Sequence, residues 1–160
     1  MRVLQPSRRA PRPGDVFVFQ LPDESFRIGM VVRTDARWTR AAGAKPAVLI
    51  YIFDYAAASP DDIPKDALRP DRLLVRPILT NRLPWTRGYF RNVENISGDE
   101  VELLPMHCFS DEAVTGAFFD EMSNRISKPV GPVGEYGLQS FRTIDDIVSD
   151  AVGIPRAAAD

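Results

Sequence analysis

A β-hairpin near the start of the chain constrains the fold more than any other feature of the sequence. Residues 15–21 and 26–33 are rich in β-branched and aromatic side chains, and residues 22–25 between them are Pro, Asp, Glu and Ser. Two β-prone runs separated by a short turn cluster predict antiparallel strands. Gly29, inside the second run, predicts a β-bulge.

Further strands are expected downstream of this hairpin. Residues 47–53 form a continuous apolar run of strand length, which predicts a strand buried on both faces, and the polar residues 35–46 predict a loop before it. Pro77 within residues 71–80 predicts an edge strand or a bulge, because proline cannot donate to a strand ladder. Other strands are predicted over residues 88–93 and 100–104.

The helical signals come late in the chain. Residues 143–152 place apolar side chains on one helical stripe, with Thr143 as the expected N-cap and Gly153 as the stop. Residues 110–122 also begin like a helix, whereas residues 59–63 predict a single turn. Strands first and helices late predict an α+β fold, with an antiparallel sheet or a partly open SH3-like barrel on the N-terminal side.

The composition predicts one domain between two short ends. A chain of 160 residues is about one domain long. Residues 1–13 are rich in Arg and Pro and lack periodicity, so they predict a flexible or loosely docked arm. We expect the domain over residues 14–153 and a tail over residues 154–160.

The chain has one histidine and one cysteine, His107 and Cys108, which are adjacent in the sequence. An internal disulfide and a two-His metal site are therefore excluded, and a reducing cytoplasm fits this usage. Neighbours on a strand point to opposite faces, so the pair does not predict a catalytic dyad. No glycine-rich phosphate loop occurs. The sequence predicts a protein that is not an enzyme and needs no metal or cofactor.

Charge is unevenly distributed along the chain. Residues 1–50 hold nine Lys and Arg against four acids, whereas residues 94–121 hold eight acids and no Lys or Arg. Such a stretch is either a solvated face or a surface that attracts a basic partner.

The hairpin resembles the opening of the MazF/PemK toxin ribonucleases, which are small SH3-like barrels. The shared segments are Pro-Gly-Asp-Val at 13–16, Leu-Pro at 21–22 and Gly-Met-Val-Val at 29–32. The chain lacks the family's Arg-Pro before the returning strand, and the run 48–53 lacks its Thr or Ser. This resemblance implies the alternative function, an RNA-binding or ribonuclease barrel that uses the Arg-rich first third.

A second resemblance, to the immunity protein 26 family, covers residues 13–153. It extends the hairpin segments with Ile-Phe-Asp-Tyr at 52–55, Ser-Pro at 59–60, the segment 84–90 around Trp85, Glu-Tyr-Gly-Leu at 135–138 and Ile-Asp-Asp-Ile at 144–147. The chain departs from the family pattern in its long 35–45 loop and in having Trp85 before Gly88 rather than a Gly just before a Trp.

This second resemblance implies that the chain is itself a bacterial antitoxin, which binds and neutralises a cognate toxin protein in the cytoplasm. We expect neither a membrane nor a nucleic acid as its partner. Two of the candidates also have a purely structural interpretation. Trp85 could fill the end of the sheet, and Asp54 could cap a loop. The candidate partner-binding residues are Asp54, Tyr55, Trp85, Arg87, Tyr89, Glu94, Asp99, Glu100 and Glu102.

Overall fold

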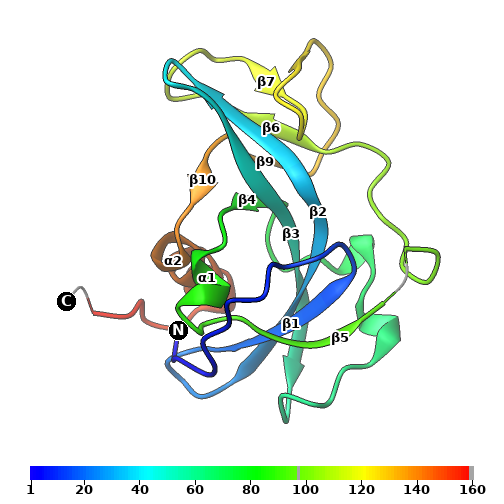
Figure 1. Ribbon diagram of the computed structural model, residues 1–160, viewed down its shortest axis with the longest axis vertical. Coiled ribbons are helices and arrows are strands. Elements are labelled where there is room, and N and C mark those ends of the chain that lie inside the picture. The colour runs from blue at the N-terminus through cyan, green and yellow to red at the C-terminus, as the bar shows by residue number, and fades with distance from the viewer. Residues whose placement is uncertain (97, 159–160) are drawn as a thin grey trace.

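The predicted hairpin is the centre of a six-stranded sheet in the computed structural model, which describes residues 1–96 and 98–158 (Figure 1). Strand β1 (Asp15–Gln20) pairs antiparallel with β2 (Phe26–Arg40). The predicted bulge is confirmed. The register of β2 against its second neighbour, strand β3 (Gly43–Ala57), shifts between Arg27 and Gly29. A Cβ at Gly29 would lie 2.3 Å from the Phe17 ring, so this position also needs glycine for packing.

The loop predicted over residues 35–46 is wrong. Strands β2 and β3 (Gly43–Ala57) are each 15 residues long and pair as far as Arg40 and Gly43. Within this segment, buried Ala36 and half-buried Trp38 alternate with exposed neighbours, which is the period of a strand with one packed face. The sequence interpretation gave more weight to overall polarity than to this alternation.

The remaining strands of the large sheet are shorter than predicted. Its order is β10-β4-β3-β2-β1-β5, with β4 at Ile78–Thr80, β5 at Arg91–Asn95 and β10 at Leu138–Gln139. The strand predicted over 71–80 begins only after Pro77. Residues Pro70–Arg72 form a 3-10 helix, a second one covers Lys65–Ala67, and residues 59–63 form a turn without a helix. The strand predicted over 88–93 starts at Arg91, because Gly88 has a φ of 85° and closes a turn.

A second, four-stranded sheet replaces the helix predicted over 110–122. Its order is β8-β7-β6-β9, with β6 at Cys108–Ser110, β7 at Phe118–Phe119, β8 at Arg125–Ile126 and β9 at Val133–Glu135. The Asp111 carbonyl accepts hydrogen bonds from the amides of Val114, Thr115 and Gly116. Gly116, at a φ of 66°, then turns the chain back into β7. The residues that resemble a helix start therefore form a hairpin turn.

Two helices complete the fold. Helix α1 (Leu83–Thr86) is one turn, and α2 (Phe141–Val152) is the predicted late helix. The N-cap of α2 is Ser140 rather than Thr143, because the Ser140 hydroxyl accepts a hydrogen bond from the Thr143 amide. Gly153 ends the helix in the left-handed conformation, as predicted. The mixed α+β class with antiparallel-rich sheets is thus confirmed.

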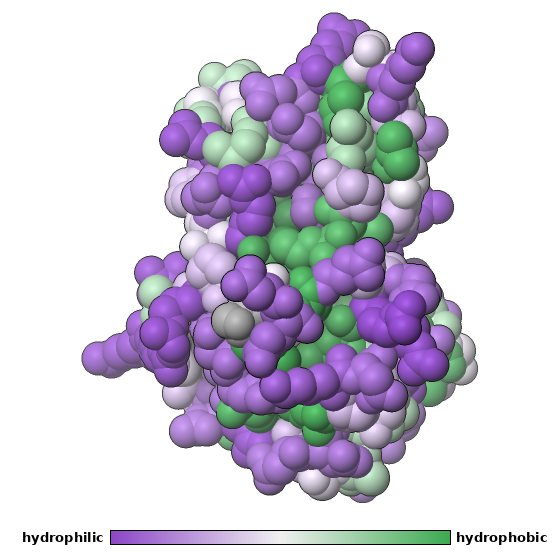
Figure 2. Space-filling view, turned by 90° about the vertical axis from the view of Figure 1, so that its right-hand side faces the viewer, coloured by the Kyte–Doolittle hydropathy of each residue, from purple (hydrophilic) through white to green (hydrophobic). Residues whose placement is uncertain are grey.

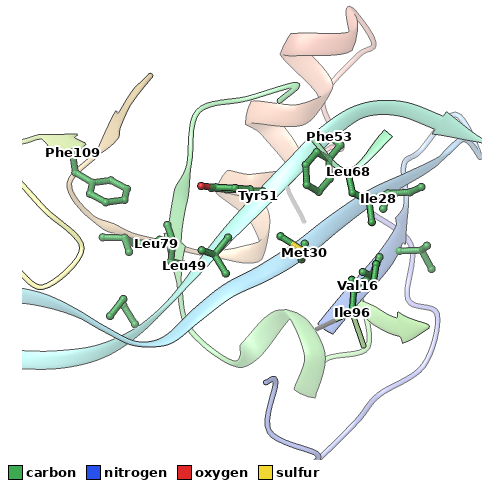
Figure 3. Packing of buried hydrophobic residues seen from close by; sticks show 14 of the residues in the cluster. Val16, Ile28, Met30, Leu49, Tyr51, Phe53, Leu68, Leu79, Ile96 and Phe109 are labelled. Carbon is green, nitrogen blue, oxygen red and sulfur yellow. The ribbon is translucent and has the colours of Figure 1, made fainter. Parts of the chain in front are cut away.

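Buried side chains form two clusters built from alternate residues of the central strands. Val16, Met30 and Tyr51 belong to the first cluster, which includes Phe109 of the small sheet (Figure 3). Phe17, Val31 and Ile50 belong to the second, which includes Trp85 and two residues of α2. Since the side chains of a strand alternate between its faces, the large sheet separates the two clusters.

The first residues of the chain lie along the segment that contains α1. The amides of Leu4 and Gln5 donate to the Gly88 carbonyl, and the Ser7 amide donates to the Trp85 carbonyl. The division into an arm over 1–13, a domain over 14–153 and a tail over 154–160 stays a prediction, and the last two tail residues lie outside the described part.

Candidate partner-binding surface

The chain between β5 and β6, of which the structure describes residue 96 and residues 98–107, forms an irregular connection on one face of the molecule. The strand predicted over 100–104 is not formed here. Leu103 and Met106 are 39% and 42% exposed, which is high for such apolar side chains, and Asp99, Glu100 and Glu102 are also exposed. Figure 2 shows the face that contains this connection, where a hydrophobic strip runs between hydrophilic residues. An apolar patch with a polar rim is typical of a protein-binding site.

A small cavity of about 120 Å³ lies beside Leu103. The cavity wall comprises Val101 and Leu103 from the connection, Pro13 and Gly14 before β1, residues 30–32 of β2, Asn95 at the end of β5, and Ile96 and Gly98 after it. Figure 3 shows Val16 and Ile96 side by side, with Met30 near them in the same buried cluster. The cavity wall is therefore formed largely by the edge of the core.

Ion pairs divide the acidic stretch 94–121 into two parts. Asp111 lies 3.5 Å from Arg40, and Glu121 lies 2.9 Å from Arg33, so two arginines of β2 pair with two of the four acids in its C-terminal part. Glu100 lies 3.7 Å from Lys65. Within the part of the chain that the structure describes, Glu94, Asp99 and Glu102 have no ion-pair partner. Among the described residues, three of the four acids of 94–102 are thus unpaired, against two of the four acids of 111–121.

A buried hydrogen-bond network holds the connection in place from below. The Tyr51 hydroxyl accepts from the Leu104 amide at 3.0 Å and lies 2.5 Å from His107 Nε2. On the other side of the imidazole, Nδ1 lies 3.5 Å from Glu121 Oε1, which also accepts from Arg33 at 2.9 Å. A proton on Nδ1 that faces Glu121 leaves Nε2 to accept from Tyr51, so every polar group in the chain of contacts has a partner.

The network shifts the ionisation of its members. The contact with His107, followed by that with Arg33, lowers the pKa of Glu121 from 4.5 to about 2. Burial raises the pKa of Tyr51 from 10.0 to about 12. Glu121 is therefore charged and Tyr51 protonated throughout the physiological pH range.

The structure does not bring the nine predicted partner-binding residues into one group. Trp85 is 1% exposed, packs against Phe17 and Phe90, and donates from Nε1 to Asn92 at 2.8 Å, so it lies in the second core cluster. Tyr89 stacks on Phe141 of α2 beside the same cluster, whereas Arg87 is exposed.

The other predicted residues lie elsewhere. Tyr55 packs against the first cluster, Asp54 next to it is exposed, and Glu94, Asp99, Glu100 and Glu102 lie on or beside the β5–β6 connection. The list of nine stays a prediction, and four of its five acids fall within residues 94–102.

His107 and Cys108 have separate environments. The His107 ring contacts Tyr51 and Glu121, whereas the Cys108 sulfur accepts a hydrogen bond from the Val130 amide at 3.3 Å. Among residues 1–96 and 98–158, no group of three or more His, Cys, Asp or Glu side chains is arranged to hold a metal ion. In the same ranges, no helix is long and apolar enough to span a bilayer.

Sequence reasoning missed the network and the apolar residues of the surface. Tyr51, Arg33 and Glu121 come from three distant segments, and only His107 attracted attention, because it is the single histidine. Leu103 and Met106 belong to a segment with no clear period. The one signal that pointed to this region was its run of acids without Lys or Arg.

This fold defines a small α+β protein in which one large sheet, mostly antiparallel, carries a second small sheet at the end of its longest hairpin. The family model of immunity protein 26 matches residues 12–118, two thirds of the chain, so the chain belongs to the immunity protein 26 family. No curated protein and no solved structure matches the chain significantly.

Proposed function

We propose that this protein is a bacterial immunity protein that binds a toxin domain in the cytoplasm and neutralises it. Membership of the immunity protein 26 family is the observation that carries this proposal. The activity expected of such a protein is stoichiometric binding, and no catalytic step is assigned to any of its residues.

The surface over residues 94–106 supports the proposal physically. Carboxylates without ion-pair partners attract a basic protein surface over a screening distance of about 8–10 Å and raise the association rate. Many nucleic-acid-cleaving toxins need basic surfaces to hold phosphate, because phosphate contacts dominate nucleic-acid affinity. A toxin domain with a basic face is therefore the partner that this surface fits.

The test uses the toxin domain encoded beside the gene for this chain. We expect the purified protein to abolish the toxin's activity at one equivalent and to protect cells that express the toxin. Toxin activity that is unchanged in the presence of excess protein, with no complex detectable by calorimetry, would contradict the proposal.

The same preparation tests the alternative of a ribonuclease barrel. The Arg33 guanidinium already contacts Asp35 at 2.9 Å and Glu121 at 2.9 Å, so its charge is shared with two carboxylates rather than available to phosphate. We expect no cleavage of single-stranded RNA by the protein alone. Cleavage that is lost on Arg27→Ala or Arg33→Ala would favour the alternative.

A further inference from the structure

We propose that the cavity beside Leu103 is the anchor point of the interface and that it receives one aliphatic side chain projecting from a basic face of the toxin. In this arrangement Leu103 and Met106 form the apolar part, and Glu94, Asp99 and Glu102 form the acidic rim. The inference rests on the proposed function and adds the chemistry and location of the contact.

Two large apolar side chains of the connection are exposed to solvent. Large apolar side chains are exposed at six described positions, and two of these belong to the single connection 96–107. Those six are Val3, Leu83, Leu103, Met106, Val114 and Val130. The adjacent cavity of about 120 Å³ is close in size to cavities of about 150 Å³ that bind a small apolar molecule. Of the two, Leu103 lines the cavity, and Met106 lies three residues further along the chain. A pocket with mostly apolar walls beside an exposed apolar side chain is typical of an interface hot spot.

The electrostatic part comes from the rim. Glu94, Asp99 and Glu102 are exposed without ion-pair partners in the described chain, whereas Asp111 and Glu121, beside the small sheet, are paired with arginines. Rim charges that surround an apolar centre select a partner of opposite charge and suppress partners of like charge. The partner is therefore a basic protein surface.

Hydrogen bonds attach the connection to the rest of the fold at two points. The Ile96 amide donates to the Gly14 carbonyl at 2.9 Å at one end, and the Leu104 amide donates to the Tyr51 hydroxyl at 3.0 Å near the other. These contacts tie Ile96 and Leu104 to other parts of the fold in the unbound protein. A preorganised surface loses less conformational entropy on association, so the cavity is suited to act as an anchor.

The experiment measures the dissociation constant of the toxin complex for single alanine variants. Leu103→Ala and Met106→Ala are each expected to weaken binding about 10- to 30-fold, the loss typical of a hot-spot side chain. The matched control is Val114→Ala, because Val114 is 63% exposed on the turn between β6 and β7 and should leave the dissociation constant unchanged. Leu103→Met retains apolar bulk and should bind nearly as wild type, which separates loss of the contact from loss of the fold.

The outcomes distinguish this inference from the proposed function. Wild-type protein that fails to bind the toxin would overturn both. Wild-type protein that binds, with Leu103→Ala and Met106→Ala as tight as Val114→Ala, would overturn the anchor while leaving toxin neutralisation intact.

Discussion

Tyr51 connects three parts of the molecule through one hydroxyl group. It lies in β3, accepts from the Leu104 amide of the connection, and contacts His107 just before β6. A buried hydroxyl with two partners stabilises a fold chiefly because its removal leaves those partners unsatisfied. The residue therefore couples the large sheet to the segment that we propose as the binding surface.

Replacement of Tyr51 by Phe is expected to lower the free energy of unfolding by about 1–3 kcal/mol, because the Leu104 amide and His107 Nε2 lose their partner. Tyr55→Phe is the matched control, since no hydrogen bond involves the Tyr55 hydroxyl in the described structure, and it should change stability by less than about 0.5 kcal/mol. Urea denaturation of both variants measures the difference. Equal stabilities would contradict the role assigned to the Tyr51 hydroxyl.

Glu121 predicts a pH dependence of stability. Its folded pKa of about 2 lies below its ordinary 4.5, so its stabilisation is complete above pH 4.5 and is lost as the pH falls towards 2. This carboxylate is partly exposed, so solvent screening limits its contribution to about 1–3 kcal/mol. The difference in unfolding free energy between wild type and Glu121→Gln should shrink across that pH window. A constant difference from pH 6 to pH 2 would argue against the shifted pKa.

At the scale of elements, a local sequence signal predicted the observed structure only where tertiary packing favours the same structure. The first hairpin and α2 carry a turn cluster and a helical stripe, and both form, although α2 is capped by Ser140 rather than by the predicted Thr143. In residues 110–122 the Asp, Glu and Ala pattern favours a helix start, but Phe118 pairs with Ser110 and Phe119 stacks on Tyr136. Tertiary packing of these aromatic side chains overrides the local helical preference. This packing joins separate segments, so the sequence of one segment does not reveal it.

The cap of α2 provides a test at this scale. Ser140→Ala removes the side-chain acceptor for the Thr143 amide and should lower the free energy of unfolding by about 1 kcal/mol. Ser127→Ala is a suitable control, because Ser127 is exposed and lies outside the helices and strands. Thermal unfolding monitored by circular dichroism measures both variants. A loss at Ser127 equal to that at Ser140 would mean that the cap does not stabilise the helix.

At the scale of the whole molecule, the sequence predicted the charge pattern better than the geometry of the surface. Net charge along a segment can be counted, so the acids of 94–102 are candidates that the sequence alone can name. Which acids are neutralised depends on long-range pairing. Arg33 and Arg40 of β2 reach Glu121 and Asp111 across 88 and 71 residues of sequence. The same dependence hides the cavity, because its walls come from separate segments.

The distribution of charge predicts how the complex assembles. Reversal of Asp99, Glu100 and Glu102 to Lys should slow association with the toxin strongly and leave the melting temperature almost unchanged, because exposed charges contribute little to stability. Added salt should slow the wild-type protein in the same way. Stopped-flow measurements across an ionic-strength series test both effects.

The control for this reversal is Glu112→Lys compared with Glu102→Lys. Both carboxylates are exposed, but Glu112 lies in the turn between β6 and β7 and not in residues 94–102. An association rate that depends on neither salt nor the triple reversal would make the acidic stretch a solvated face.

Hydrogen–deuterium exchange of this protein with and without its toxin domain tests the central claim most directly, because it locates the contact without any substitution. Our account predicts that the toxin protects the described amides between residues 94 and 106, and that amides 111–116 of the small-sheet turn exchange as in the free protein. Protection over residues 82–91 around α1, with no change between 94 and 106, would contradict the account and place the binding surface beside Arg87 and Tyr89.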